Sequence, residues 1–273
     1  MKGVRAMCRW IAYRGKPVFL DELVAAPARS LIAQSICAEE AATRTNGDGF
    51  GVGWYGERPQ PGLYREVRPA WSDENLRSIC AQVRSPLFFA HVRASTGAAS
   101  ARANCHPFVR GRLMFMHNGQ IGDYPTVKRR VEALIPDSCY AERQGATDSE
   151  ALFLAAFGDG LEEDPVAAFA ATLARVLRIM EAAGVREPLR FTSALTDGET
   201  LWAFRWASDD QAPSLYYRMG GGDGLTIASE PLDSEEGRWR QAPQGCVIVA
   251  RAGARPHVRC MNEAMRDARR QAA

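Results

Sequence analysis

A cysteine near the start of the sequence is the first residue that could perform covalent chemistry. Cys8 begins a short strand predicted over residues 8–13, in which alternate side chains face opposite sides. A thiol at the end of such a strand would be rigidly aimed and could act as a nucleophile. Free cysteine is also among the residue types most often buried, so Cys8 alone does not identify an active site.

Two strongly apolar segments farther along the chain end in polar residues. Residues 87–93 and 113–118 are predicted to form strands that are apolar on both faces, as expected inside a layered core. At or just beyond their C-terminal ends stand His91, Arg93, His117, Asn118 and Gly119. Polar side chains at the ends of buried strands often line a site, although both histidines could be hydrogen-bonded core residues and Arg93 a structural ion-pair partner.

The loop between these strands is too long for a simple turn, and loops of this length are often functional. It spans residues 94–112 and contains Ser95-Thr96 and Asn104-Cys105-His106. The three histidines with Cys105 could also form a metal cluster, but their spacing matches no familiar zinc signature. We therefore predict no metal site.

Two further patterns belong to elements that would position these residues. Glycine recurs at every second position from Gly47 to Gly53, which removes side chains from one strand face and lets another backbone or a ligand approach. A phosphate loop is less consistent, because Gly-Lys-Ser/Thr is absent. Residues 147–150, Thr-Asp-Ser-Glu, form a capping-box pattern before an apolar helix, so Asp148 could simply complement a helix N-terminus.

The order of predicted elements indicates an α+β protein. Strands in the first half enclose one helix over residues 72–83, which Ser72 would cap. They are followed by helices over residues 123–134, 151–157 and 165–183, with an irregular segment over residues 136–145, and strands return over residues 189–250. No Pro-, Gly- or Ser-rich linker and no internal repeat separates the halves, so we predict one layered domain over residues 8–260. Residues 261–273 form a basic C-terminal tail that is either a weakly amphipathic helix or frayed.

Composition narrows the class of protein. The 273 residues are 46% hydrophobic and 24% charged, with a net charge of +2, which suits a globular protein and gives no reason to expect nucleic acid as a partner. No apolar run approaches the roughly 18 residues of a membrane span, and the N-terminus lacks a signal-peptide core. The seven cysteines show no CxxC spacing, which favours a reducing, cytoplasmic location.

Taken in order, these motifs resemble the glutaminase domain of class II glutamine amidotransferases. The sequence runs Met7-Cys8, Asn-Gly-Asp-Gly-Phe-Gly-Val-Gly-Trp-Tyr, Ala-His-Val-Arg-Ala-Ser-Thr, Asn-Cys-His-Pro-Phe, His-Asn-Gly and Thr-Asp-Ser-Glu. The resemblance extends from Cys8 to about residue 154, with weaker support at residues 227–232. It looks closest to small stand-alone members, such as the γ-glutamyl hydrolases of ergothioneine synthesis and of glutathione breakdown.

The resemblance implies a fold and a set of roles. The fold would be a four-layer αββα sandwich of two mostly antiparallel sheets, that of the N-terminal nucleophile hydrolases. Cys8 would attack the γ-glutamyl carbonyl with its own α-amine as base, and Asn118 with the Gly119 N–H would hold the oxyanion. Arg93 and Asp148 would bind the α-carboxylate and α-ammonium of the substrate. The remaining substrate-binding residues would be Ser95, Thr96 and His106, the last ordering its loop.

The sequence departs from the family in two respects. The family begins at its cysteine, whereas Met1–Ala6 precede Met7 here, so residues 1–7 are either a misassigned start or a processed leader. If Cys8 stays internal, the base is missing. Synthase-type members also carry a large acceptor domain, and the roughly 120 residues after Asp148 are needed to complete the layered fold.

The function that this resemblance predicts is hydrolysis of glutamine or a larger γ-glutamyl compound through a thioester on Cys8, with no cofactor. One alternative is a glutaminase subunit that passes ammonia to a separate synthetase; a separate peptidase partner is also conceivable. Another is an inactive binding or regulatory module, which a retained leader would support. The leaving group and the oligomeric state are open at this point.

Overall fold

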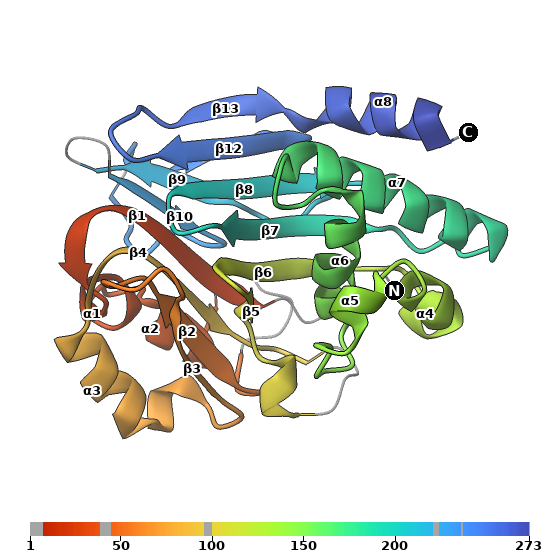
Figure 1. The fold of residues 1–273 in the computed structure, drawn as a ribbon. Coiled ribbons are helices and arrows are strands. Elements are labelled where there is room, and N and C mark those ends of the chain that lie inside the picture. The colour runs from red at the N-terminus through yellow and green to blue at the C-terminus, as the bar shows by residue number, and fades with distance from the viewer. Residues whose placement is uncertain (1–7, 39–44, 96–99, 221–223, 236, 273) are drawn as a thin grey trace.

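The computed structural model describes residues 8–38, 45–95, 100–220, 224–235 and 237–272. Its strands form two antiparallel sheets (Figure 1). In spatial order, the first sheet contains β11 (Arg240–Gln241), β9 (Tyr216–Met219), β10 (Leu225–Ala228), β1 (Arg9–Phe19), β4 (Arg84–Val92), β2 (Phe50–Trp54) and β3 (Gly62–Glu66). The second contains β13 (His257–Cys260), β12 (Cys246–Arg251), β8 (Thr200–Ala207), β7 (Arg190–Thr196), β6 (Leu113–Gln120) and β5 (Phe108–Arg110).

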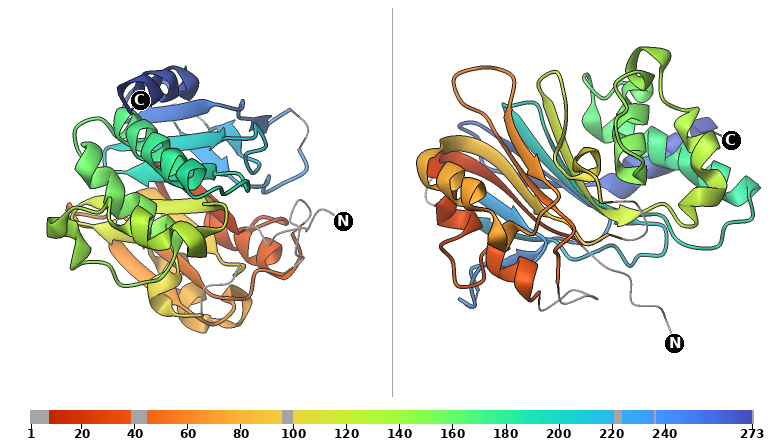
Figure 2. Two further views of the ribbon diagram at one scale, coloured as in Figure 1. Left: turned by 90° about the vertical axis from the view of Figure 1, so that its right-hand side faces the viewer. Right: turned by 90° about the horizontal axis from the view of Figure 1, so that it is seen from below.

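Helices cover the outer faces of both sheets. The first sheet is covered by α1 (Asp21–Val24), α2 (Leu31–Ile36) and α3 (Glu74–Gln82). The second is covered by α4 (Tyr124–Glu132), α5 (Asp137–Tyr140), α6 (Asp148–Ala156), α7 (Pro165–Ala182) and α8 (Met261–Ala272). The view from below in Figure 2 shows these layers edge-on, which confirms the predicted four-layer αββα sandwich.

The first strand demonstrates how the sequence builds these layers. Trp10 and Ala12 of β1 pack between the two sheets, whereas Ile11 and Tyr13 pack against the helices of the first sheet. This is the two-residue alternation expected of a strand, and both faces are apolar because both are covered. Cys8 directly precedes this strand, at one end of the sandwich.

The same alternation decides which polar residues face the space between the sheets. In β6, Met114 and Met116 pack between the sheets and Phe115 packs against the helices, so Asn118 shares the inner face and His117 the outer one. In β4, Leu87 and Phe89 pack between the sheets, so Arg93, just beyond the strand, continues that face.

Alternate glycines in β2 admit another part of the chain at close range. A Cβ on Gly51 would lie 2.2 Å from the carbonyl oxygen of His106, and one on Gly53 would lie 2.3 Å from Sδ of Met114. The close approach predicted for this glycine face is therefore made by backbone and side chain of the loop before β5 and by β6. Gly49, with φ +115°, provides the turn into the strand.

Several element boundaries differ from the sequence-based expectation. The helix predicted from Ser72 begins at Glu74 instead, because the Asp73 side chain accepts from the Leu76 N–H and acts as its N-cap. Residues 136–145, predicted to be irregular, contain the single-turn helix α5. The short edge strands β5, β11 and β13 were not predicted, and β5 lies in the segment expected to be a loop over residues 94–112. In the described part of the chain, each of the three pairs with one neighbouring strand.

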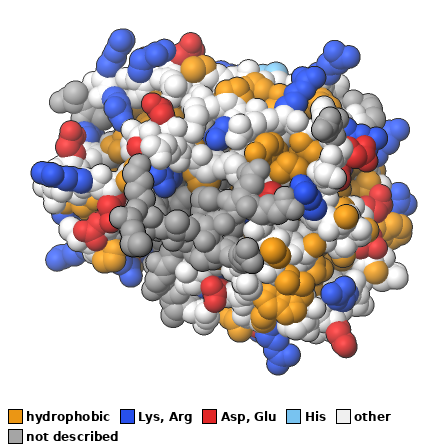
Figure 3. Space-filling model, turned by 180° about the vertical axis from the view of Figure 1, so that it is seen from behind, with side chains coloured by type: hydrophobic (Ala, Val, Ile, Leu, Met, Phe, Trp, Pro, Cys, Tyr) orange, Lys and Arg blue, Asp and Glu red, His pale blue; other side chains and the backbone are white. Residues whose placement is uncertain are grey.

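The C-terminal residues fold onto the second sheet rather than standing apart from it. Met261 and Met265 of α8 are buried in the core cluster that includes α7, while charged residues occupy the other side of the helix. In the described part of the chain, no helix combines the length and apolar character needed to cross a bilayer. The face seen in Figure 3 carries Lys and Arg side chains interspersed with Asp and Glu rather than a surface of one sign.

Candidate active site

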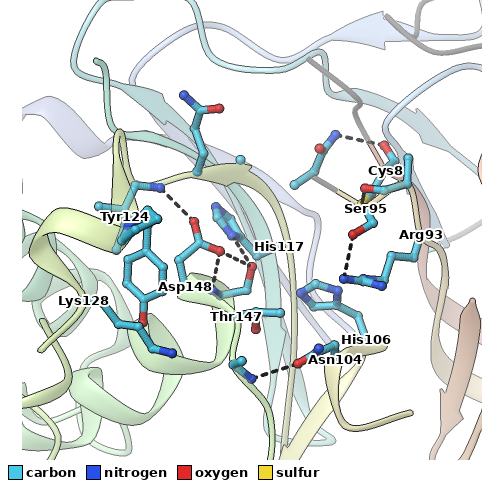
Figure 4. A pocket seen from close by; sticks show the side chains of 18 of the residues that line it. Cys8, Arg93, Ser95, Asn104, His106, His117, Tyr124, Lys128, Thr147 and Asp148 are labelled. Carbon is cyan, nitrogen blue, oxygen red and sulfur yellow. Dashed lines mark hydrogen bonds between the residues drawn. The ribbon is translucent and has the colours of Figure 1, made fainter. Parts of the chain in front are cut away.

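A cavity of about 760 Å³ opens at the end of the sandwich where β1 begins and β6 ends. Its lining includes seven residues to which the sequence analysis assigned roles: Cys8, Arg93, Ser95, His106, Asn118, Gly119 and Asp148. Figure 4 shows Cys8, Ser95 and Arg93 on one side of it and Asp148 on the other. Thr96 lies outside the described residues. The predicted site residues are thus gathered from five separate segments into one cavity.

Cys8 is half-buried at the cavity wall, and its thiol points to the carbonyl oxygen of Ala94 at 3.6 Å. Burial raises the pKa of this thiol, and the positive charges of Arg93 and Arg9 oppose that effect only in part. The thiol is therefore protonated near neutral pH and needs a base before it can act as a nucleophile.

Asn118 lies next to the cysteine although 110 residues separate them in the sequence. Its Nδ2 donates to the Cys8 carbonyl oxygen at 3.1 Å. An amide NH2 carries two hydrogens, so one can hold the Cys8 backbone while the other serves a second acceptor in the cavity. Gly119 follows directly, and a Cβ there would lie 2.0 Å from the Arg190 carbonyl oxygen, which requires glycine at this position.

Arg93 is 4% exposed and is held in place from two sides. Its Nη1 donates to the Asp48 carbonyl oxygen at 3.3 Å and its Nη2 to Ser95 Oγ at 3.2 Å, while the Asp48 carboxylate accepts from the Ser95 N–H at 2.7 Å. The Asn-Gly-Asp-Gly turn thus supports Arg93 and Ser95, a role that its turn chemistry did not reveal. A guanidinium fixed in this way can bind a carboxylate in a defined orientation.

Asp148 is the first residue of α6. Its carboxylate accepts from the backbone N–H of Ile121 at 2.8 Å and of Ser149 at 2.8 Å. The capping box predicted here is only half formed, because Thr147 accepts from the Glu150 N–H but Glu150 accepts from Gln144 and Gly145 instead. Asp148 therefore orders the cavity wall and also presents a carboxylate to the cavity.

Three of the four histidines are buried around the cavity. His117 bonds to Ser149 Oγ at 2.9 Å and to the Arg190 carbonyl oxygen at 3.1 Å, as expected of a hydrogen-bonded core histidine. His91 and His106 pack ring against ring, with centroids 4.3 Å apart. Burial lowers the pKa of each of the three, that of His91 to about 3, so all are uncharged near neutral pH.

The structure adds residues that the sequence analysis did not select. Tyr124, Lys128 and Glu187 also line the cavity. Figure 4 shows Tyr124 and Lys128 on the same side of the cavity as Asp148. Arg9 and Glu230 form an ion pair beneath Cys8. An arginine within a strand predicted to be buried could have drawn attention to Arg9. Nothing local in the sequence, however, links Arg9 to Glu230. Among the described residues, no group of three or more His, Cys, Asp or Glu side chains is placed to hold a metal ion.

Comparison with known proteins identifies the family. The family model "Glutamine amidotransferases class-II" matches residues 26–217. The probable glutamine amidotransferase DUG3 of Saccharomyces cerevisiae is 34% identical over 89% of this chain and 81% of its own length. The γ-glutamyl-hercynylcysteine sulfoxide hydrolase of Mycolicibacterium smegmatis is 28% identical over 90% of this chain and 96% of its own.

Solved structures agree with this match. A glutamine aminotransferase class-II domain protein from Silicibacter pomeroyi superimposes with a TM-score of 0.74 at 38% identity, covering 93% of this chain and 99% of that one. The glutamine phosphoribosylpyrophosphate amidotransferase of B. subtilis shares the fold, with a TM-score of 0.62 at 14% identity, over 93% of this chain but 49% of its own. The chain therefore belongs to the class II glutamine amidotransferases and is an amidohydrolase of that family.

Proposed function

We propose that this protein hydrolyses the γ-glutamyl amide bond of glutamine or of a larger γ-glutamyl compound through a thioester on Cys8. The observation that carries the proposal is the convergence of a cysteine thiol, an amide donor, a fixed guanidinium and a carboxylate on one cavity. Amide hydrolysis at a γ-glutamyl group requires a nucleophile, an oxyanion site and a clamp for a zwitterionic head group, and these four groups match those needs.

In the proposed mechanism, Cys8 is the first residue of the active protein and its α-amine is the base. The amine accepts the thiol proton, and the thiolate adds to the γ-carbonyl carbon. The resulting oxyanion is stabilised by the Asn118 amide and the Gly119 N–H. Collapse of this intermediate expels the leaving amine, which takes the proton from the α-ammonium, and leaves a γ-glutamyl thioester.

The second half of the reaction releases glutamate. The α-amine accepts a proton from a water molecule while the oxygen of that water adds to the thioester carbonyl carbon. The Cys8 sulfur then leaves and takes this proton from the α-ammonium, which restores the thiol. Arg93 and Asp148 hold the α-carboxylate and α-ammonium of the glutamyl group throughout both steps. Ser95 supports the Arg93 guanidinium, and the buried His106 forms part of the cavity wall.

The size of the cavity favours substrates larger than glutamine. A volume of about 760 Å³ lies within the range typical of sites for drug-sized ligands. Tyr124, Lys128 and Glu187 extend its lining beyond the four groups assigned to the glutamyl half. A relative named for a γ-glutamyl-hercynylcysteine sulfoxide substrate supports the same reading.

Two measurements test this function together. Intact-mass spectrometry of the protein expressed from its native gene should give a chain that begins at Cys8. The same preparation should release glutamate from glutamine or γ-glutamyl dipeptides, and Cys8→Ser should abolish release. A chain that retains Met1–Met7 yet hydrolyses these amides would rule out the amine as base, whereas ammonia release that requires a co-purified synthetase would favour a glutaminase subunit.

A further inference from the structure

The side chain of Arg9 is completely buried directly behind the nucleophile. Its Nε donates to Glu230 Oε2 at 2.9 Å, and its Nη1 donates to the carbonyl oxygen of Cys8 at 3.0 Å. Glu230 is 3% exposed, so both charges of this ion pair are removed from water. The partners are 221 residues apart in the sequence: Arg9 is the first residue of β1, and Glu230 follows the neighbouring strand β10.

The acid of this pair is also held firmly by its surroundings. The residue before Glu230, Ser229, accepts from the Trp10 N–H through its Oγ and donates its own N–H to the Trp10 carbonyl oxygen. Gln34 of α2 donates to the Glu230 carbonyl oxygen at 3.4 Å. Glu230 is therefore a fixed anchor for the guanidinium, and the guanidinium is a fixed donor to Cys8.

The Cys8 carbonyl oxygen consequently accepts two hydrogen bonds from opposite sheets, one from Arg9 and one from Asn118 at 3.1 Å. Two donors on one carbonyl fix the peptide plane of Cys8. Because the thiol and the backbone nitrogen both branch from the Cα bonded to this carbonyl, the two donors fix the point from which both groups extend. Small displacements of reacting groups can lower rates by up to about 10²-fold, so this restraint bears directly on catalysis.

Stability alone is a poor explanation for this arrangement. Desolvating two charges is costly, and buried ion pairs can often be replaced by apolar residues without loss of stability. A charged pair next to a nucleophile instead alters its electrostatic environment. Arg9 is one of the two arginines that lower the pKa of the Cys8 thiol against the effect of burial.

We propose that Arg9 and Glu230 form a positioning pair for the nucleophile: Arg9 orients the Cys8 backbone and supplies positive charge, and Glu230 sets the position and net charge of Arg9. The inference rests on the proposed function for its catalytic consequence, but not for its effect on the thiol. The other charged groups around Cys8 are Arg93 beyond β4 and Asp148 of α6, and the Cys105 thiol is close enough to be influenced by it.

Two variants separate geometry from charge. Glu230→Gln keeps a hydrogen-bond acceptor for Arg9 but removes the negative charge, so the less compensated Arg9 should stabilise the thiolate. Arg9→Lys keeps the positive charge but cannot donate to Glu230 and to the Cys8 carbonyl in the same forked geometry. Arg218→Lys is the control, because Arg218 forms an ion pair with Asp233 at 2.6 Å in the same sheet, away from the cavity.

The first readout is the rate of Cys8 alkylation by iodoacetamide between pH 7 and 11, measured by peptide mass spectrometry on the full-length protein. Glu230→Gln should shift the midpoint of the profile to lower pH by roughly 0.5–1 unit, whereas Arg9→Lys and Arg218→Lys should keep the wild-type midpoint. This measurement needs no substrate. If the wild-type protein releases no glutamate but Glu230→Gln still shifts the alkylation midpoint, the proposed function is refuted and the positioning pair is retained.

The second readout is steady-state hydrolysis of a γ-glutamyl dipeptide. Arg9→Lys should lower kcat by about tenfold or more while KM changes less than about twofold, because the nucleophile and not the head-group clamp is displaced. An unshifted alkylation midpoint in Glu230→Gln overturns the proposal. So does an unchanged kcat in Arg9→Lys, or losses that merely follow the folded fraction measured by circular dichroism.

Discussion

The side-chain amide of Asn118 connects the two sheets at the point where catalysis is proposed. One of its two N–H groups donates to the Cys8 carbonyl oxygen, and the proposed mechanism assigns the other to the oxyanion. In the proposed mechanism, Asn118 therefore combines positioning of the nucleophile with stabilisation of the intermediate. Both contributions are lost together when the amide is removed.

Asn118→Ala should lower kcat by about 10²–10³-fold, which corresponds to about 2.7–4 kcal/mol, with a much smaller change in KM. The reason is that an oxyanion donor acts mainly in the transition state. Steady-state kinetics with a γ-glutamyl dipeptide measures this effect. Asn75→Ala, on the exposed side of α3, is the control and should behave as wild type. A kcat within about twofold of wild type would remove Asn118 from the oxyanion site.

Arg93→Lys should raise KM for γ-glutamyl substrates by about tenfold or more. Lysine carries one point charge and cannot form parallel hydrogen bonds to a carboxylate while also bonding to Ser95 and Asp48. The comparison is Arg102→Lys, whose side chain is 66% exposed and forms an ion pair with Glu66 outside the cavity. Equal KM values for the two variants would contradict a carboxylate clamp at Arg93.

At the scale of elements, strand β2 determines how closely the loop carrying His106 can approach the first sheet. Its glycine face leaves the space that the His106 carbonyl oxygen and Met114 occupy. His106 in turn packs on His91, one residue before the end of β4. The loop reaches the cavity wall only because this strand has no side chains on that face.

Gly51→Ala should lower the free energy of unfolding by about 1–3 kcal/mol, because the added methyl group overlaps the His106 backbone and forces strand or loop to shift. Urea denaturation followed by circular dichroism measures the change. Gly56→Ala is a matched control, since a Cβ there meets nothing within 4 Å. If both variants unfold at the same urea concentration, close approach is not what requires glycine at position 51.

At the scale of the whole molecule, the fold keeps three histidines uncharged within its core. His91, His106 and His117 have pKa values lowered by burial, that of His91 to about 3. The unfolded chain therefore binds more protons than the folded one below about pH 6.5. This contribution to stability is complete above pH 6.5 and is lost as the pH falls toward the folded-state values.

His91 should contribute a slope of about 1.4 kcal/mol per pH unit to the free energy of unfolding between roughly pH 6 and pH 4, because its folded-state pKa is about 3. His91→Gln should reduce the slope of the free energy of unfolding against pH by about 1.4 kcal/mol per pH unit, the contribution of one proton. Urea unfolding at several pH values measures this slope. His257→Gln, on the exposed strand β13, should keep the wild-type slope. Parallel slopes for wild type and His91→Gln would show that His91 titrates normally in the folded protein.

Much of this molecule could be predicted because the relevant patterns are local. The alternation in β1, the apolar strands β4 and β6, and the long helix α7 follow from side-chain period and composition over a few residues. Boundaries were less accurate where two capping residues compete, as Ser72 and Asp73 do before α3. The edge strands β5, β11 and β13 were missed because short strands that pair with one neighbour leave little pattern in the sequence.

The types of residue that can perform hydrolysis, and the strand ends on which they stand, are properties of the sequence itself, since they depend on side-chain chemistry and on the two-residue period of a strand. The pairing of Arg9 with Glu230, the contact of Asn118 with Cys8 and the neutral state of the histidines depend on which faces meet and which groups lose water. Separations of 221 and 110 residues leave no local trace of such contacts. Only the packing of the two sheets decides them.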